Sequence, residues 1–288
     1  MIYIVFLERI AFPGGRIMKL EQFAAMNMVY QRFSFQYALD SMQRLGIDRF
    51  ELWAGGSHPN CYVSDLADMK ALKSELDRRG MTVTCMTPEQ CIYPYNIATP
   101  NAELRRQSLD YFLKYIDMTA ELGVEKMLCG AGWGDLDEPV EDAWKRSVES
   151  LWVMTKHAEK RGVKLAFEIL QFLESNLVYN YETTRRMFDE IDHPNFCLCV
   201  DTVPMRVDGK TLDDFFQGFG DRIIHIHLTD GTPTGHLPLG AGNIDVREQF
   251  DALDRNGYTG DVTLELGAWM DRPEESTKLA FDTVKKYL

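Results

Sequence analysis

Short apolar runs alternate with longer amphipathic segments along most of this 288-residue chain. A buried parallel strand is hydrophobic on both faces, so it reads as a continuous apolar run of about 4–8 residues. Runs of this kind recur eight times and predict eight strands. They cover residues 20–26, 49–53, 81–86, 124–129, 164–170, 196–201, 223–228 and 262–266.

The segments between these runs have the spacing of amphipathic helices. Ala38, Met42 and Leu45 fall on one helical face, and longer segments of the same kind end just before Gly123 and Gly162. A glycine at such a place stops a helix, because glycine adopts the left-handed C-terminal conformation at little cost. Three later helices are predicted to be short, over residues 181–191, 212–218 and 246–256.

The repeated order of strand, helix and glycine predicts an α/β fold, a single-domain (β/α)8 TIM barrel over residues 18–288. An open doubly wound sheet is the alternative, but no glycine-rich phosphate loop follows the first strand. Residues 1–17 precede the regular pattern and are treated as an N-terminal appendage of unknown role. Glu8 and Arg9 interrupt their apolar start, which leaves it too short for a signal peptide or a membrane span.

The net charge and the cysteine content exclude several classes of binding partner. A formal net charge of −13 argues against nucleic acid and anionic membranes. The six cysteines form no CxxC pair, which argues against a structural zinc cluster. Four of them fall in predicted strands, where a free thiol behaves as a small hydrophobe; these are Cys85, Cys129, Cys197 and Cys199. We therefore expect a reduced, cytoplasmic protein that acts on a small molecule.

Four acid or imidazole side chains recur at matching places in the later strands: Glu168, Asp201, His227 and Glu265. Each lies near the C-terminal end of an apolar run, where barrels of this type carry their active sites. One such side chain can be a buried polar group bonded to a neighbour. Three carboxylates and an imidazole together would need a cation between them, which predicts a divalent metal site. His225 shares a strand face with His227, and we choose His227 because it lies nearer the mouth.

Three long loops would border that site, over residues 54–62, 87–100 and 229–243. These loops and the one after the fourth strand contribute further candidates for the pocket lining: His58, Tyr93, Trp133 and His236. Aromatic side chains in long loops as often pack the loop onto the barrel, so these candidates carry weaker signals than the strand-end group.

Several segments resemble the xylose-isomerase-like sugar epimerases, a barrel family that includes the ketose 3-epimerases and the fructoselysine 3-epimerases. The resemblance covers nearly all of the chain after residue 20. It is carried by Phe167-Glu-Ile-Leu-Gln-Phe-Leu-Glu174, Val200-Asp201, His225-Ile-His227 and Leu264-Glu265.

This resemblance implies a role for each member of the strand-end group. All four would hold one divalent ion, commonly Mn²⁺, with Zn²⁺, Co²⁺ or Mg²⁺ as alternatives. Glu168 and Glu265 would also exchange protons at the carbon beside the carbonyl of a ketose, through an enediolate that the ion stabilises. Glu174 would bind the sugar near its first carbon.

Two departures from the family pattern bear on the substrate. Ketose 3-epimerases have a His three residues after the metal-binding Asp and an Arg six residues after the metal-binding His. This chain has Pro204 and Pro233 at those places. The usual contacts to substrate hydroxyls are then missing, as in the fructoselysine 3-epimerases, which favours a substituted or bulky sugar.

Two other functions share the barrel. The catalytic subunits of C-glycoside deglycosidases also resemble it, use the same deprotonation beside a ketone to expel an aglycone, and need a small β-rich partner subunit. A non-catalytic sugar-binding barrel is the other alternative, although binding alone requires no pair of glutamates at one carbon. The epimerase hypothesis predicts a homo-oligomer, and the deglycosidase hypothesis predicts a hetero-oligomer with the small subunit.

Overall fold

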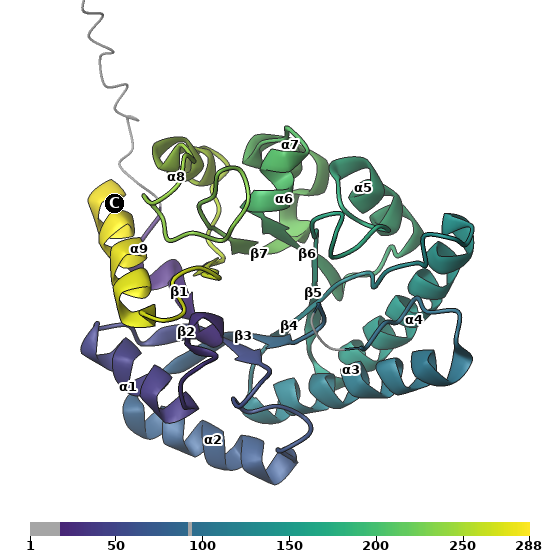
Figure 1. The fold of residues 1–288 in the computed structure, drawn as a ribbon, viewed down its shortest axis with the longest axis horizontal. Coiled ribbons are helices and arrows are strands. Elements are labelled where there is room, and N and C mark those ends of the chain that lie inside the picture. Colours follow the sequence, from purple (N-terminus) through teal and green to yellow (C-terminus); the bar gives the residue numbers. More distant parts are fainter. Residues whose placement is uncertain (1–17, 92–93) are drawn as a thin grey trace, which may run out of the picture.

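The computed structural model describes residues 18–91 and 94–288. Parallel strands pair in sequence order and the last pairs with the first, so the sheet closes into a barrel, as the sequence predicted (Figure 1). The strands are β1 (Phe23–Met26), β2 (Arg49–Ala54), β3 (Thr82–Pro88), β4 (Lys126–Cys129), β5 (Lys164–Glu168), β6 (Phe196–Asp201), β7 (Ile223–His227) and β8 (Asp261–Leu264).

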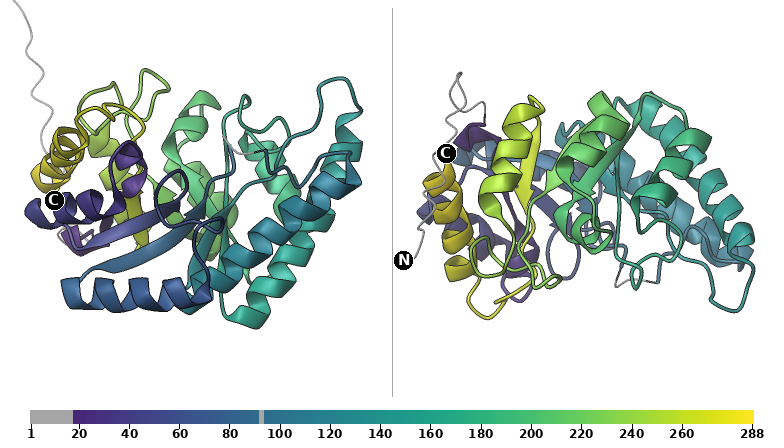
Figure 2. Two further views of the ribbon diagram at one scale, coloured as in Figure 1. Left: turned by 60° about the horizontal axis from the view of Figure 1, so that its bottom comes forward. Right: turned by 90° about the horizontal axis from the view of Figure 1, so that it is seen from above.

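Helices surround the barrel, as the side views of Figure 2 also show. They are α1 (Phe35–Arg44), α2 (Leu66–Arg79), α3 (Ala102–Leu122), α4 (Val140–Arg161), α5 (Tyr181–Glu190), α6 (Thr202–Val207), α7 (Leu212–Phe219), α8 (Val246–Arg255) and α9 (Pro273–Tyr287). The two longest end at Gly123 and Gly162, whose φ angles of 77° and 70° are left-handed, as the glycine signal predicted. Among the described residues, no helix is long and apolar enough to cross a membrane.

Several of the observed elements differ from the predicted ones. Leu20–Gln22 forms a 3-10 helix, so the first strand starts later than predicted. The additional helix α6 begins directly after β6, because the Asp201 carboxylate accepts a hydrogen bond from Val203 N and caps the helix. The last strand ends just before Glu265, which therefore lies in the following loop.

Alternation along the strands decides which side chains point into the barrel. Phe167 of β5 packs on Phe196 and on Phe188 of α5, with ring centroids 5.0 and 6.1 Å apart. It therefore faces the helices, and its neighbour Glu168 faces the barrel interior. A separate cluster of buried side chains shares that inner face: Cys85, Leu128, Ala166 and Cys199. Three of the four are small and leave room for the larger polar side chains beside them.

Candidate active site

His227, the last residue of β7, is fully buried within a cluster of acidic side chains. Its Nδ1 atom lies 2.6 Å from Glu168 Oε1 and 3.0 Å from Glu265 Oε2. Glu168 is the last residue of β5, and Glu265 directly follows β8. The three side chains therefore meet at the C-terminal mouth of the barrel.

Asp201 joins this cluster from β6. It pairs in register with His227 of the neighbouring strand. One of its oxygens caps α6, and the other, Oδ2, lies 3.4 Å from His236 Nε2. The same His236 nitrogen lies 3.4 Å from Glu265 Oε2. The structure thus brings all four predicted ligands into one connected cluster, while their roles stay a prediction.

His236 reaches the cluster from the loop between β7 and α8. Its φ of 44° is in the left-handed region, which side chains other than glycine seldom adopt. Its carbonyl accepts hydrogen bonds from Gly267 N and Ala268 N, at 3.0 and 3.2 Å. A Cβ atom at Gly267 would come within 3.2 Å of the His236 Cβ, so glycine permits this close approach.

Asp230 fixes the loop that carries His236. Its carboxylate accepts hydrogen bonds of 2.8–3.0 Å from the backbone N–H groups of Gly231, Gly240, Gly242 and Ile244. Because an ionised acceptor makes strong hydrogen bonds, these contacts tie both arms of the loop together. Asp230 was not among the predicted site residues, although this acid follows closely after a strand, as the predicted ligands do.

The members of the cluster shift one another's protonation. Burial raises the pKa of Glu168 to about 8, although the adjacent His227 opposes this shift. Burial also acts to raise the pKa of Glu265, but His227 and His236 outweigh it and lower the value. Burial disfavours the charged form of His236, yet Glu265 and Asp201 raise its pKa to about 12. Near neutral pH, the Glu168 carboxyl is therefore mostly protonated and uncharged, and His236 is a positively charged imidazolium.

The donor set fits a divalent ion. His227 Nδ1 and Glu265 Oε2 are buried and lie 3.0 Å apart, but no contact of either atom with the described residues has the geometry of a good hydrogen bond. Buried polar atoms are otherwise nearly always paired. Carboxylate oxygens and an imidazole nitrogen are ligands that first-row divalent metals accept. An ion within the cluster would give both atoms a partner.

A cavity of about 190 Å³ opens beside the cluster. Five carboxylates line it: Glu89, Glu168, Glu174, Asp201 and Glu265. Among the described residues of its lining, His236 is the one side chain that can carry a positive charge. Apolar side chains, including Met26, Trp53 and Leu170, form much of the remaining wall. This electrostatic environment suits a neutral or cationic small molecule and disfavours an anionic one.

Two of these acids lie outside the predicted ligand set. Glu89 directly follows β3, and its Oε2 accepts a hydrogen bond of 2.8 Å from Trp53 Nε1. Glu89 was not among the predicted site residues, although it has the same strand-end position as the predicted ligands. Glu174 was predicted to bind substrate and does border the cavity. Burial raises the pKa of Glu174, whose Oε2 accepts from Gln171 N at 3.0 Å.

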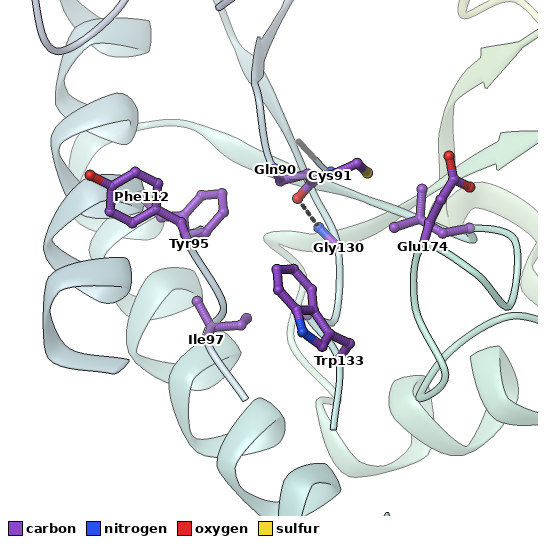
Figure 3. Close-up of a pocket in the computed structure, with 10 residues that line it drawn as sticks. Gln90, Cys91, Tyr95, Ile97, Phe112, Gly130, Trp133 and Glu174 are labelled. Carbon is purple, nitrogen blue, oxygen red and sulfur yellow. Dashed lines mark hydrogen bonds between the residues drawn. The ribbon is translucent and has the colours of Figure 1, made fainter. Parts of the chain in front are cut away.

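The remaining loop candidates lie elsewhere. Trp133 borders a narrow crevice next to the cavity, with Tyr95 and Glu174 among its neighbours (Figure 3). His58 is fully buried, with its ring nitrogens 2.7 Å from Asn27 Nδ2 and 3.0 Å from the Phe33 carbonyl oxygen. These bonds hold His58 within the packing of its loop, away from the cavity lining. Tyr93 lies outside the described residues.

The sequence from α1 to α9 matches a known family. The model of the xylose isomerase-like TIM barrel family matches residues 39–287. The chain belongs to the xylose isomerase-like TIM barrel family, which confirms the resemblance seen in its motifs.

Several proteins that are similar in sequence to this chain are named epimerases. Fructoselysine 3-epimerase of Shigella flexneri is 29% identical over 265 residues, which are 90% of this chain and 95% of that protein. D-psicose 3-epimerase of Ruminiclostridium cellulolyticum is 25% identical, over 80% of this chain and 78% of that protein. A crystal structure of D-psicose 3-epimerase with D-tagatose from Clostridium cellulolyticum shares the fold, with a TM-score of 0.76 at 20% identity over 93% of this chain and 99% of that one.

Proposed function

We propose that this protein is a sugar epimerase that inverts the carbon beside the carbonyl of a ketose or substituted ketose, with one divalent ion bound. The observation that carries the proposal is the position of Glu168 and Glu265, 2.6 and 3.0 Å from one imidazole nitrogen at the barrel mouth. Their strands are separated by β6 and β7, so the two carboxylates approach a bound sugar from different sides. The names of the relatives support the same reaction class.

The two glutamates take the proton-transfer roles. One carboxylate removes the proton beside the carbonyl, and the other returns a proton to the opposite face of the same carbon. A bound divalent ion, with Mn²⁺ as the first candidate, would stabilise the negative charge that develops on the adjacent oxygens. Asp201 and His227 complete the ligand set. His236 and Glu174 border the cavity and are assigned to the sugar hydroxyls.

The sequence and the cavity lining both favour certain substituents. Pro204 and Pro233, at the places where ketose 3-epimerases have a His and an Arg, provide no hydrogen-bond donor to a sugar hydroxyl. Glu89 and Glu174 add negative charge to the wall, which favours a substituent that is neutral or positively charged. The proposed substrate class is therefore a ketose with such a substituent rather than a sugar phosphate.

Incubation with a panel of ketoses and substituted ketoses in D₂O with Mn²⁺ tests the function directly. Deuterium at the carbon beside the carbonyl, together with the second epimer, would demonstrate proton abstraction and identify the substrate. If the protein binds Mn²⁺ and yet exchanges no deuterium into any member of a broad panel, the epimerase proposal is wrong.

A terminal phosphate on an accepted ketose is expected to lower kcat/KM by about 10²-fold or more. Like charges brought together at a binding site cost several kcal/mol, and about 1.4 kcal/mol corresponds to a tenfold change. Five carboxylates exceed the charge that one divalent ion and the His236 imidazolium would bring. Kinetics on a matched pair of free and phosphorylated ketose would measure the effect, and equal values would contradict the charge argument.

Mn²⁺ binding at pH 7 is expected to release at least one proton. The pKa of Glu168, about 8, means that this carboxyl is mostly protonated at pH 7, whereas a metal ligand has to be ionised. The apparent affinity should therefore increase as the pH rises toward that pKa and fall below it. Calorimetry in buffers of different ionisation enthalpy would count the protons. A binding enthalpy independent of the buffer would show that no proton leaves.

A further inference from the structure

A second polar layer lies deeper in the barrel, next to His227. Glu51, in β2, is fully buried. Its Oε2 atom lies 2.6 Å from His225 Nε2 and 3.1 Å from His227 Nε2. The Thr87 hydroxyl donates a hydrogen bond to its other oxygen, Oε1. Three donors from two other strands therefore converge on one carboxylate that is shielded from solvent.

The direction of these hydrogen bonds follows from the groups at either end. Lys126 Nζ lies 3.3 Å from His225 Nδ1. An ammonium group can only donate, so His225 Nδ1 accepts and the ring proton is on Nε2, toward Glu51. A carboxylate can only accept, so His227 also directs an N–H from its Nε2 atom to Glu51. His227 Nδ1, on the other side of the ring, faces the acidic cluster at the mouth, and it is the ring atom that would bind an ion there.

The contacts that begin at Glu51 continue through His225 to Lys126, which lies at the opposite end of the barrel. Lys126 Nζ lies 2.5 Å from Asp261 Oδ2, and Asp261 also pairs with Arg49. Lys126, Asp261 and Arg49 are the first residues of their strands. The ammonium group beside His225 also argues against a second cation at Glu51. Among the described residues, the side chains that hydrogen-bond to the buried carboxylate are His225, His227 and Thr87.

We infer that Glu51 is a positioning residue: it fixes the orientation of the His227 ring and keeps a proton on His227 Nε2, so that His227 Nδ1 faces the proposed ion. This inference rests on the proposed function in one respect, the presence of an ion at His227. Histidine ligands commonly donate their other ring N–H to a carboxylate or carbonyl, and loss of that partner lowers metal affinity by about 10–100-fold. Glu51 does not border the cavity, so it acts through His227 and not on the substrate.

Mn²⁺ titration of the Glu51→Gln variant tests the inference. Glutamine keeps the side-chain shape but removes the charge and one acceptor, so Kd is expected to rise by about 10–100-fold. Asp117→Asn is the control for removing the charge of a carboxylate beside a histidine, because Asp117 Oδ1 lies 2.8 Å from His157 Nε2 in a partly exposed pair between α3 and α4. That variant is expected to keep the wild-type Kd.

The His227 ring provides a second readout that a purely structural role would not move. The chain has six histidines, so nitrogen NMR on the Zn²⁺-loaded protein can resolve them. We expect the metal at His227 Nδ1 and a slowly exchanging proton on Nε2. In Glu51→Gln this proton should shift and exchange faster, whereas Asp117→Asn should leave it unchanged.

The outcomes separate the inference from the proposed function. A wild-type protein that binds neither Mn²⁺ nor Zn²⁺ would overturn the ion site itself. A wild-type protein that binds Mn²⁺, with the same Kd and the same His227 signal in Glu51→Gln, would overturn only the positioning role. If Glu51→Gln fails to fold, the Kd of the Thr87→Val variant for Mn²⁺ tests the positioning role instead. It removes one donor from Glu51 and should give a smaller rise in Kd, and an unchanged Kd would overturn the inference.

Discussion

Replacing Glu168 or Glu265 by Gln is expected to lower epimerisation turnover by about 10²–10⁴-fold, the usual contribution of a positioned acid or base. Glutamine keeps the shape of the side chain and one oxygen for an ion, but its amide cannot take up or release the proton. Turnover at saturating Mn²⁺ and ketose would measure the loss. Glu103→Gln, which removes an exposed carboxylate paired with Arg106 on α3, should leave turnover unchanged.

Deuterium exchange separates the roles of the two glutamates. Each epimer presents its proton to only one of the two faces, so each variant should lose exchange with one epimer and retain part of it with the other. Epimerisation needs both groups and should be lost in both variants. If either variant keeps Mn²⁺ and turns over near the wild-type rate, that glutamate is a ligand only, and the two-base mechanism is wrong.

The barrel and the strand-end cluster could be predicted because both follow from local rules. Phe167 and Glu168 show why: neighbours in a strand face opposite sides, so an acid next to an outward aromatic residue must point inward. Parallel strands in a closed sheet also end on the same side. The sequence order alone therefore places Glu168, Asp201 and His227 at one mouth.

Contacts between distant strands could not be predicted in the same way. Glu51 lies in an apolar run just as the predicted ligands do, but its partners His225 and His227 are 174 and 176 residues away. Only the closed barrel shows that the three side chains meet. His58 illustrates the opposite case, because its loop has the composition of a pocket lining. Hydrogen bonds to Asn27 and to the Phe33 carbonyl hold it inside the packing instead.

Chelation is expected to abolish turnover and to lower the Tm, and added Mn²⁺ is expected to restore both. The described cluster gathers Glu168 and Glu265 around His227, and two of its buried atoms make no well-aligned hydrogen bond, so an ion should favour the folded state. A ligand that binds only the folded protein stabilises it by ~2.7 kcal/mol at a free concentration of 100 Kd. For a large domain, that free energy corresponds to a rise in Tm of about 5–10 °C. Thermal melts with and without Mn²⁺ would measure this rise.

Two histidine variants locate the ion within the cluster. The Mn²⁺-dependent rise in Tm should disappear in His227→Ala, because the proposed site loses its nitrogen ligand. It should survive in His236→Ala, since His236 is assigned to the substrate although its Nε2 lies 3.4 Å from both Asp201 and Glu265. Each variant is compared with its own metal-free form, so any loss of packing cancels. The reverse result, in which His227→Ala keeps the Mn²⁺-dependent rise in Tm and His236→Ala loses it, would contradict this assignment. It would place the ion among Asp201, His236 and Glu265, whose ligand atoms also lie close enough together to hold one.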